Sequence, residues 1–360
     1  ADVAAGGVVI DADAEVAAEA VSKGYGFAIA GAVGVSSARA EASPHVNAYV
    51  GAGSNVNAGS LDITARQGSP AEEYSAAAQA SGASGGLLVG VNATFSEAVN
   101  NGWVLARVDE NSTLAVSGAT SLQALTDSSQ YSSADGYAGG LMAAGANVAR
   151  TSSTTITGSW LGSGVSLVGG SLNIEAGGVD DNFAGAAAGS GGVIAGSGAT
   201  AYTSSSSNTS AALNPGAQID VASLQVKADH TAVFNSAADS FNAALVGGSG
   251  AVAENSVESH VDVSMGAGAG ITAGEIDLQA NNRILKDWLP ADAYNAASGS
   301  GGALDQPAVS SKTAISNTTA ITVEDGAVLD VVNRDGKSGL LSLSALNDIT
   351  ARDRARLDSG

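Results

Sequence analysis

A short pattern of apolar, polar, apolar, polar and alanine residues recurs along the chain and constrains its fold more than any other feature. Successive copies begin 53, 61, 50, 52, 52 and 65 residues apart, which indicates a repeat of about 52 residues with insertions in the second and last intervals. Such self-similarity is typical of solenoids, in which each unit buries its apolar face against its neighbours. The clear copies begin at Leu61, Leu172, Leu224, Ile276 and Leu341, and two degenerate copies begin at Val8 and Leu122.

The alternation within each copy predicts a β-strand with one buried face. Glycine and serine precede most copies, which predicts a short strand, a tight corner and another short strand. Later glycine steps such as Gly85-Gly86 predict further corners, so we expect four or five short strands in each unit. A coil of roughly 20 to 30 residues would make about two coils per unit. Alanine runs occupy corresponding places in several units, so we also predict them to be strands, at Ala76–Ala78, Ala186–Ala188 and Ala237–Ala238.

The predicted fold is therefore all-β: an elongated β-solenoid, a right-handed parallel β-helix built from ~52-residue repeats. Residues 1–360 read as one continuous array and as a fragment of a longer chain. Segment 283–300 breaks the repeat, so we predict a loop insertion there, folded back over the solenoid or protruding as a contact surface. The expected units are 8–60, 61–121, 122–171, 172–223, 224–275, 276–340 and, in part, 341–360.

Composition narrows both the core and the partners. The chain is 44% hydrophobic but only 4% aromatic and contains 48 glycines, so its interior must be narrow and filled by small side chains. A net charge of −21 argues against nucleic acid and against an anionic membrane surface. No run approaches the roughly 18 apolar residues of a membrane span, so we expect no membrane insertion in this segment. There is no cysteine, which suits a long solenoid without disulfides.

The candidate chemical groups do not combine into a predicted catalytic, cofactor or metal site. The three histidines are far apart in sequence, and we interpret His45, His230 and His260 as surface or strand-face residues. The acids allow an incidental Ca²⁺ at a corner but lack the pattern of a calcium loop; they are the alternating Asp11, Asp13 and Glu15 and the adjacent Asp180 and Asp181 near a glycine corner.

An enzyme of this fold would need carboxylates clustered on one outer face. The outward second positions of the pattern hold only two aspartates, four units apart, so we expect no enzyme activity. Their amides and short polar groups can instead form stacked hydrogen-bond ladders. The row is predicted to be Asp62, Gln123, Asn173, Gln225, Asp277 and Ser342.

Three short sequence segments carry a resemblance to a known family: Gly-Ser-Leu-Asp-Ile-Thr-Ala at 59–65, Gly-Ser-Leu-Asn-Ile-Glu-Ala at 170–176 and Ala-Gly-Glu-Ile-Asp-Leu-Gln-Ala at 273–280. With them, nearly the whole chain resembles the filamentous-haemagglutinin-like exoproteins and leukotoxin-type filamentous adhesins of bacteria. The resemblance implies a right-handed β-helix, export across the outer membrane and an extracellular or bacterial cell-surface location. It also implies a role in attachment, aggregation or biofilm formation, and no catalytic residues.

The expected partner is then a host or bacterial surface protein or glycan, and self-association is a further expectation. An alternative interpretation is a self-assembling extracellular fibre or sheath subunit, whose copies stack end to end. Filaments that form spontaneously from the purified chain would favour that alternative.

Overall fold

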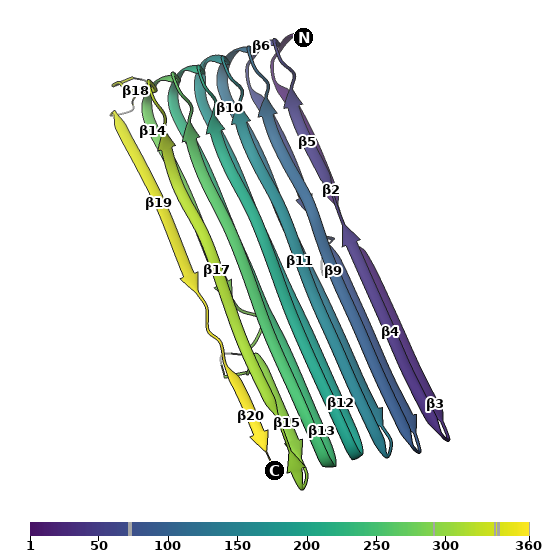
Figure 1. The fold of residues 1–360 in the computed structure, drawn as a ribbon. Helices are drawn as coiled ribbons and strands as arrows, with labels where there is room; N and C mark the ends of the chain where they lie inside the picture. Colours follow the sequence, from purple (N-terminus) through teal and green to yellow (C-terminus); the bar gives the residue numbers. More distant parts are fainter. Residues whose placement is uncertain (71–73, 291, 335, 337–338, 360) are drawn as a thin grey trace.

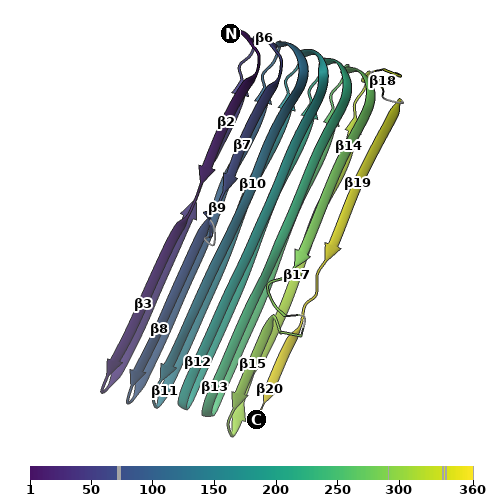
Figure 2. The ribbon, with the colours of Figure 1, turned by 180° about the vertical axis from the view of Figure 1, so that it is seen from behind.

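The chain forms an elongated β-solenoid, as predicted. The structure, a computed structural model, describes residues 1–70, 74–290, 292–334, 336 and 339–359. Within these ranges the secondary structure consists of strands, and each strand pairs in parallel with the equivalent strand of the next coil (Figure 1). Each coil runs down one sheet, which we call the descending sheet, and returns up a second, ascending sheet behind it (Figure 2).

The strands group into six coils and part of a seventh within the described ranges. The first coil holds β1 (Asp2–Ala5), β2 (Val8–Glu15), β3 (Ala18–Ala28), β4 (Gly31–Ala42) and β5 (His45–Val50), and the second β6 (Asn55–Ala58), β7 (Leu61–Gly68), β8 (Ala76–Gly86) and β9 (Val89–Val108). The third holds β10 (Thr113–Gly139) and β11 (Met142–Leu161), the fourth β12 (Ser166–Leu213), and the fifth β13 (Gln218–Met265). The last two hold β14 (Gly270–Lys286), β15 (Ala296–Gly301), β16 (Leu304–Asp305) and β17 (Ala308–Val323), then β18 (Val328–Val331), β19 (Leu340–Thr350) and β20 (Ala355–Ser359).

One repeat unit makes one coil, so the expectation of two coils per unit is wrong. The expected four or five strands per unit are found in the first, second and sixth coils, whereas one or two long strands form the third, fourth and fifth coils. Along β12 and β13 each residue pairs with the residue 52 positions later, from Ser166↔Gln218 to Leu213↔Met265. The glycine steps that predicted corners mostly continue as strand. Small side chains let two sheets pack closely along their whole length, so each coil needs only two long legs.

Two kinds of turn close each coil. At one end of the solenoid, which we call the wide end because the larger core side chains lie there, the coils are joined by four-residue turns. One residue of each turn lies in the left-handed region. This residue is glycine in every described coil except the second, where Asn111 has φ 56°. Asparagine tolerates this conformation better than most residues. At the opposite, narrow end the chain reverses over about two residues, for example at 87–88 and 140–141.

The strand register corrects one predicted unit boundary. Thr120 pairs with both Leu61 and Leu172, so the third unit starts at 120 and the predicted copy at Leu122 is shifted by two residues. Thr120 is polar, yet its side chain is buried at the first position of the repeated pattern, which leucine occupies in several other units. Consequently Ser121, rather than Gln123, lies in the outward row with Asp62.

The inserted residues lie at particular heights of the coil. Ala18 pairs with Ala76, 58 positions later, which places the insertion of the second interval between β7 and β8. The last interval, from Ile276 to Leu341, contains two insertions relative to the 52-residue repeat. One lies before β15 and the other between β18 and β19. The predicted loop 283–300 is too long, because 283–286 belong to β14 and 296–300 to β15, where they keep their ladder pairing. Only 287–295 leave the strands, and Ala291 lies outside the described residues.

The core tapers from the wide end to the narrow end. Leucine, isoleucine and valine fill the wide end, as at Ile63 and Leu172, whereas the middle of the coil contains clusters built only from alanine, including Ala186 and Ala238. The alanine runs are strands, as predicted. At the height of Ala188, a Cβ added to Gly24 of the first coil would lie 2.4 Å from the carbonyl oxygen of Val35 in the facing sheet. The stacked residues at this height are glycine, alanine or serine, so the two sheets leave room there for small side chains alone.

Candidate functional site

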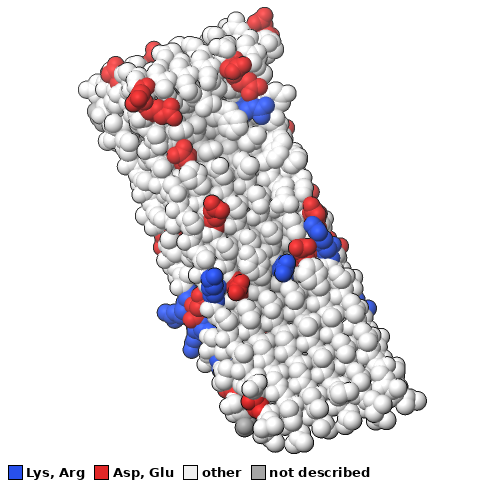
Figure 3. Space-filling view, viewed as in Figure 1, with Lys and Arg blue, Asp and Glu red and all other residues white. Residues whose placement is uncertain are grey.

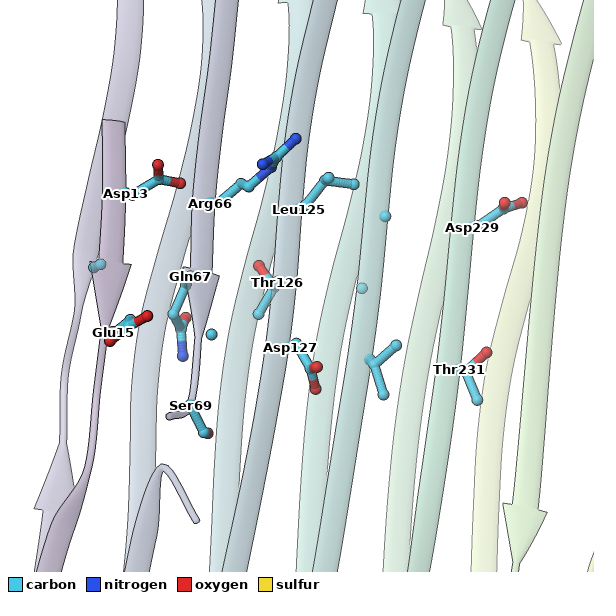
Figure 4. Close-up of a pocket in the computed structure, with 15 residues that line it drawn as sticks. Asp13, Glu15, Arg66, Gln67, Ser69, Leu125, Thr126, Asp127, Asp229 and Thr231 are labelled. Carbon is cyan, nitrogen blue, oxygen red and sulfur yellow. The ribbon is translucent and has the colours of Figure 1, made fainter. Parts of the chain in front are cut away.

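A groove crosses the outer face of the descending sheet, about midway between the two ends (Figure 4). It encloses about 620 Å³ and spans the first five coils. Gly177 lines the groove at the outward position that Leu125 and Asp229 fill on the adjacent coils. A Cβ on Gly177 would lie 2.9 Å from the Cδ2 atom of Leu125, so a side chain there would displace Leu125 and narrow the groove.

Carboxylates dominate the groove lining. Asp13, Glu15, Asp127 and Asp229 line it with one guanidinium, that of Arg66. The aspartates come from the first, third and fifth coils, and adjacent coils are about 4.8 Å apart, so successive aspartates are separated by roughly 10 Å or more. Groups spread in this way suit an extended partner with several donors or positive charges better than a single ion.

An outer-face ladder adjoins the groove toward the wide end. Gln123 donates to Glu175 at 3.1 Å on the next coil, and Asn281 donates to Asp229 at 2.7 Å. Gln225 of the second-position row donates to Asp277 at 3.4 Å, so a link of the predicted amide ladder is confirmed. Asp62 and Asp277 are separated by three intervening coils, in agreement with the expectation that they do not meet.

Four aromatic rings pack together on the same outer face, on the side of the groove toward the narrow end. The ring centroids of Tyr74 and Tyr131 are 5.1 Å apart, those of Tyr131 and Phe183 are 5.8 Å apart, and those of Phe183 and Trp288 are 5.0 Å apart. Tyr74 comes from the insertion between β7 and β8 and Trp288 from the insertion before β15, whereas the other two rings stand on paired positions of β10 and β12. Residues 287–290, which carry Trp288, thus fold back over the solenoid, one of the two predicted alternatives for segment 283–300.

Asp181 lies beside this aromatic cluster and accepts a hydrogen bond from the indole Nε1 of Trp288. Burial raises the pKa of Asp181 to about 6; the bond from Trp288 opposes this shift, and the nearby carboxylates of Asp180, Asp127 and Asp287 add to it. Burial also raises the pKa of Tyr74. The contact between the inserted segment and the sheet therefore contains an acid that titrates close to neutrality.

The stability of this contact should fall as pH rises. The folded pKa of Asp181 is about 6 against an ordinary value of 3.8, so between these values the folded protein keeps a proton that the unfolded chain releases. Its stabilising contribution is complete below about pH 4 and is lost as pH rises through about 6. We expect Asp181→Asn to flatten this dependence. The measurement is Trp288 fluorescence during urea unfolding at several pH values, in a Trp103→Phe/Trp160→Phe background; an unchanged slope would contradict the assignment.

Directly beneath the groove and the aromatic cluster, the interior contains a polar band. Asp180 is 1% exposed and accepts hydrogen bonds from the hydroxyls of Ser128 (3.0 Å), Ser153 and Ser205. His230 is buried in the same band, and burial lowers its pKa to about 4 against the opposing effect of Asp180. The imidazole is therefore neutral at pH 7, and the hydroxyls supply the hydrogen bonds that the buried carboxylate requires.

The predicted site residues separate in the structure. His45 and His260 are exposed, His45 stacking on Trp103 at 4.9 Å, whereas the surface interpretation is wrong for the buried His230. Asp180 and Asp181 lie within β12 rather than at a corner, and successive residues of a strand point to opposite faces. Within the described ranges, no three His, Cys, Asp or Glu side chains gather closely enough to hold a metal ion.

Comparison of the chain with protein-family models, with curated proteins and with solved structures finds no match. In the part of the chain that the structure describes, no helix is long and apolar enough to cross a bilayer.

Proposed function

We propose that this chain is a structural and binding segment of a secreted bacterial surface adhesin, which mediates attachment to cells, aggregation or biofilm formation. The observation that carries the proposal is the groove across five coils, with the aromatic cluster beside it, on the outer face of a rod-like solenoid. A rigid sheet holds these side chains at fixed spacing, so an extended partner can bind without ordering the protein first.

The chemistry of the groove indicates the partner class. Carboxylates, a guanidinium and the hydroxyls of Ser69 and Thr231 offer hydrogen-bonding groups suited to a surface glycan or a polar protein segment. The four acids lie on three coils, with Asp13 and Glu15 on the same strand, and they favour a partner with donor or cationic groups. We propose a binding role without catalysis, as the resemblance to filamentous adhesins implies.

Neutralising the groove should abolish attachment while leaving the fold intact. We expect a non-adherent bacterium displaying the chain to bind cells or a glycan array, and binding to fall at least about tenfold when four exposed or partly exposed acids are changed. The groove variant is Asp13→Asn, Glu15→Gln, Asp127→Asn and Asp229→Asn. The matched control makes the same change of charge away from the groove, at Asp2, Glu110, Asp325 and Asp330. Equal loss in both variants would show a charge effect and contradict a groove-specific site.

A self-assembling fibre subunit, whose copies stack end to end, is the second candidate. Equivalent strands pair in parallel from coil to coil, as Leu172 with Leu224 and Leu224 with Ile276, and the same pairing between two molecules would extend the ladder. Electron microscopy of dilute purified chain separates the candidates, because unlimited filaments favour the fibre and discrete rods favour the adhesin segment.

A further inference from the structure

The narrow end presents a continuous line of exposed apolar side chains, which we call the apolar ridge. Two adjacent columns of residues stack from coil to coil at the tight turns. Backbone hydrogen bonds tie the columns together, as from Leu141 N to Leu87 O (3.2 Å) and from Met142 N to Leu88 O (2.8 Å). The large side chains of the ridge are Ile29, Leu87, Leu88, Leu141, Met142, Val193, Ile194, Leu245, Val246 and Leu304.

The turn geometry does not require these residues. The steps before the turns must be small, since a Cβ on Gly86 would lie 2.1 Å from the carbonyl oxygen of Val89, and one on Gly192 would lie 2.1 Å from that of Gly140. The side chains at the apex therefore point outward, where serine, asparagine or aspartate would serve a turn equally well. Leu87 is instead 71% exposed and Leu245 58% exposed. Apolar residues on six successive coils indicate a surface that a partner covers.

The charge distribution identifies a second copy of this chain as the partner. With a net charge of −21, two copies repel each other wherever their charged surfaces meet. In Figure 3 the charged side chains on this face lie at the wide end, singly across the middle and along the outermost coils, whereas the narrow half is nearly uncharged apart from an acidic spot beside the last coil. Ridge-to-ridge contact keeps the charged parts of this face on the two copies apart.

The geometry and area of the ridge also suit self-pairing. Both copies carry side chains at the same ~4.8 Å coil spacing, so two ridges related by a twofold axis can interdigitate along their length. Fully burying a side chain of this size removes roughly 60–120 Å² of apolar surface from water, and ten that are about half exposed offer roughly 300–600 Å² per copy. A standard interface uses about 800 Å² per partner, so a pair of this length is weak and strengthens as coils are added.

We propose that the apolar ridge is a lateral self-association surface through which two copies of this solenoid pair side by side. The inference deepens the proposed function, because side-by-side pairing of adhesins on different cells joins those cells. It is distinct from end-to-end stacking, which uses the edge coils, and from binding in the groove, which lies on a broad face.

The first test compares oligomeric state by analytical ultracentrifugation over a range of concentration. We expect a monomer–dimer equilibrium for the native chain and at least about tenfold weaker dimerisation for Leu87→Ser/Leu141→Ser/Ile194→Ser/Leu245→Ser. The control replaces four exposed apolar residues elsewhere, Val9, Val35, Ile156 and Val168, by serine and should dimerise like the native chain. A native chain that stays monomeric at high concentration, or dimers that persist in the ridge variant, would overturn the proposal. Circular dichroism verifies that each variant is folded.

The second test uses the absence of cysteine from the chain. Leu141→Cys lies near the centre of the ridge, so we expect mild oxidation to give a covalent dimer, whereas Val168→Cys should remain largely monomeric. Efficient cross-linking at 168 but not at 141 would contradict the assignment.

Flotation of the native chain with phosphatidylcholine vesicles, combined with a monomeric state in solution, would identify lipid as the occupant of the apolar ridge and would also overturn the proposal. Loss of cell attachment with intact dimers would refute the adhesin role alone.

Discussion

Replacing Ala188 by leucine is expected to destabilise the solenoid by about 3 kcal/mol or more, although both residues are apolar. Ala188 is fully buried in a cluster made only of alanine, which includes Ala199 and Ala201 of the returning leg. The three added carbons cannot enter without separating the two sheets, and long ladder hydrogen bonds on either side resist that separation. Urea unfolding followed by circular dichroism measures the loss, and hydrogen exchange shows whether it concentrates in the middle of the coils.

Ala187→Leu is the matched control for this prediction. Ala187 is adjacent in the same strand, but it points outward and is partly exposed. The substitution there changes the same residue type and volume without entering the core, so we expect a change within about 0.5 kcal/mol. Equal destabilisation by the two variants would mean that strand propensity, rather than the narrow interior, explains the alanine clusters.

The fold class was predictable because its signal repeats. Period-two alternation and an interval of about 52 residues together predict parallel strands stacked in register, and Leu172, Leu224 and Ile276 pair as that interval requires. The number of coils per unit was not predictable from the same pattern. Glycine is found both at tight corners and where two sheets approach closely. In this structure the pair Gly169-Gly170 lies within a strand. Only the packing of the facing sheet decides between these uses.

The candidate site depended on contacts that the sequence pattern does not contain. Tyr131 and Phe183 are 52 positions apart, so their stacking follows from the repeat. Tyr74 and Trp288 lie in inserted segments, whose side-chain directions no periodicity describes. Strand alternation alone assigns the adjacent Asp180 and Asp181 to opposite faces, but the preceding Gly177-Gly178 also predicts a corner, and the sequence pattern does not decide between the two.

Removing the buried carboxylate should have a second large effect. We expect Asp180→Ala to destabilise the protein by about 3–5 kcal/mol, because Ser128, Ser153 and Ser205 lose their common acceptor inside the core. Those hydroxyls come from the third and fourth coils, on both the descending and ascending sheets, so the carboxylate joins the two sheets at this height. Urea unfolding at pH 7 measures the change.

Two further variants separate this polar role from simple loss of volume. Asp180→Asn keeps one acceptor oxygen and nearly the same volume, so we expect it to retain more stability than Asp180→Ala and to remain folded if the alanine variant does not. Asp181→Asn changes the neighbouring outward carboxylate, which makes no bond to the three serines, and removes a charged group that burial disfavours at pH 7. Its stability should therefore equal or exceed that of the native chain. If the alanine variant at position 180 were as stable as the native chain, the hydroxyls would be satisfied by water or by one another, and the two sheets would be held at this height by packing alone.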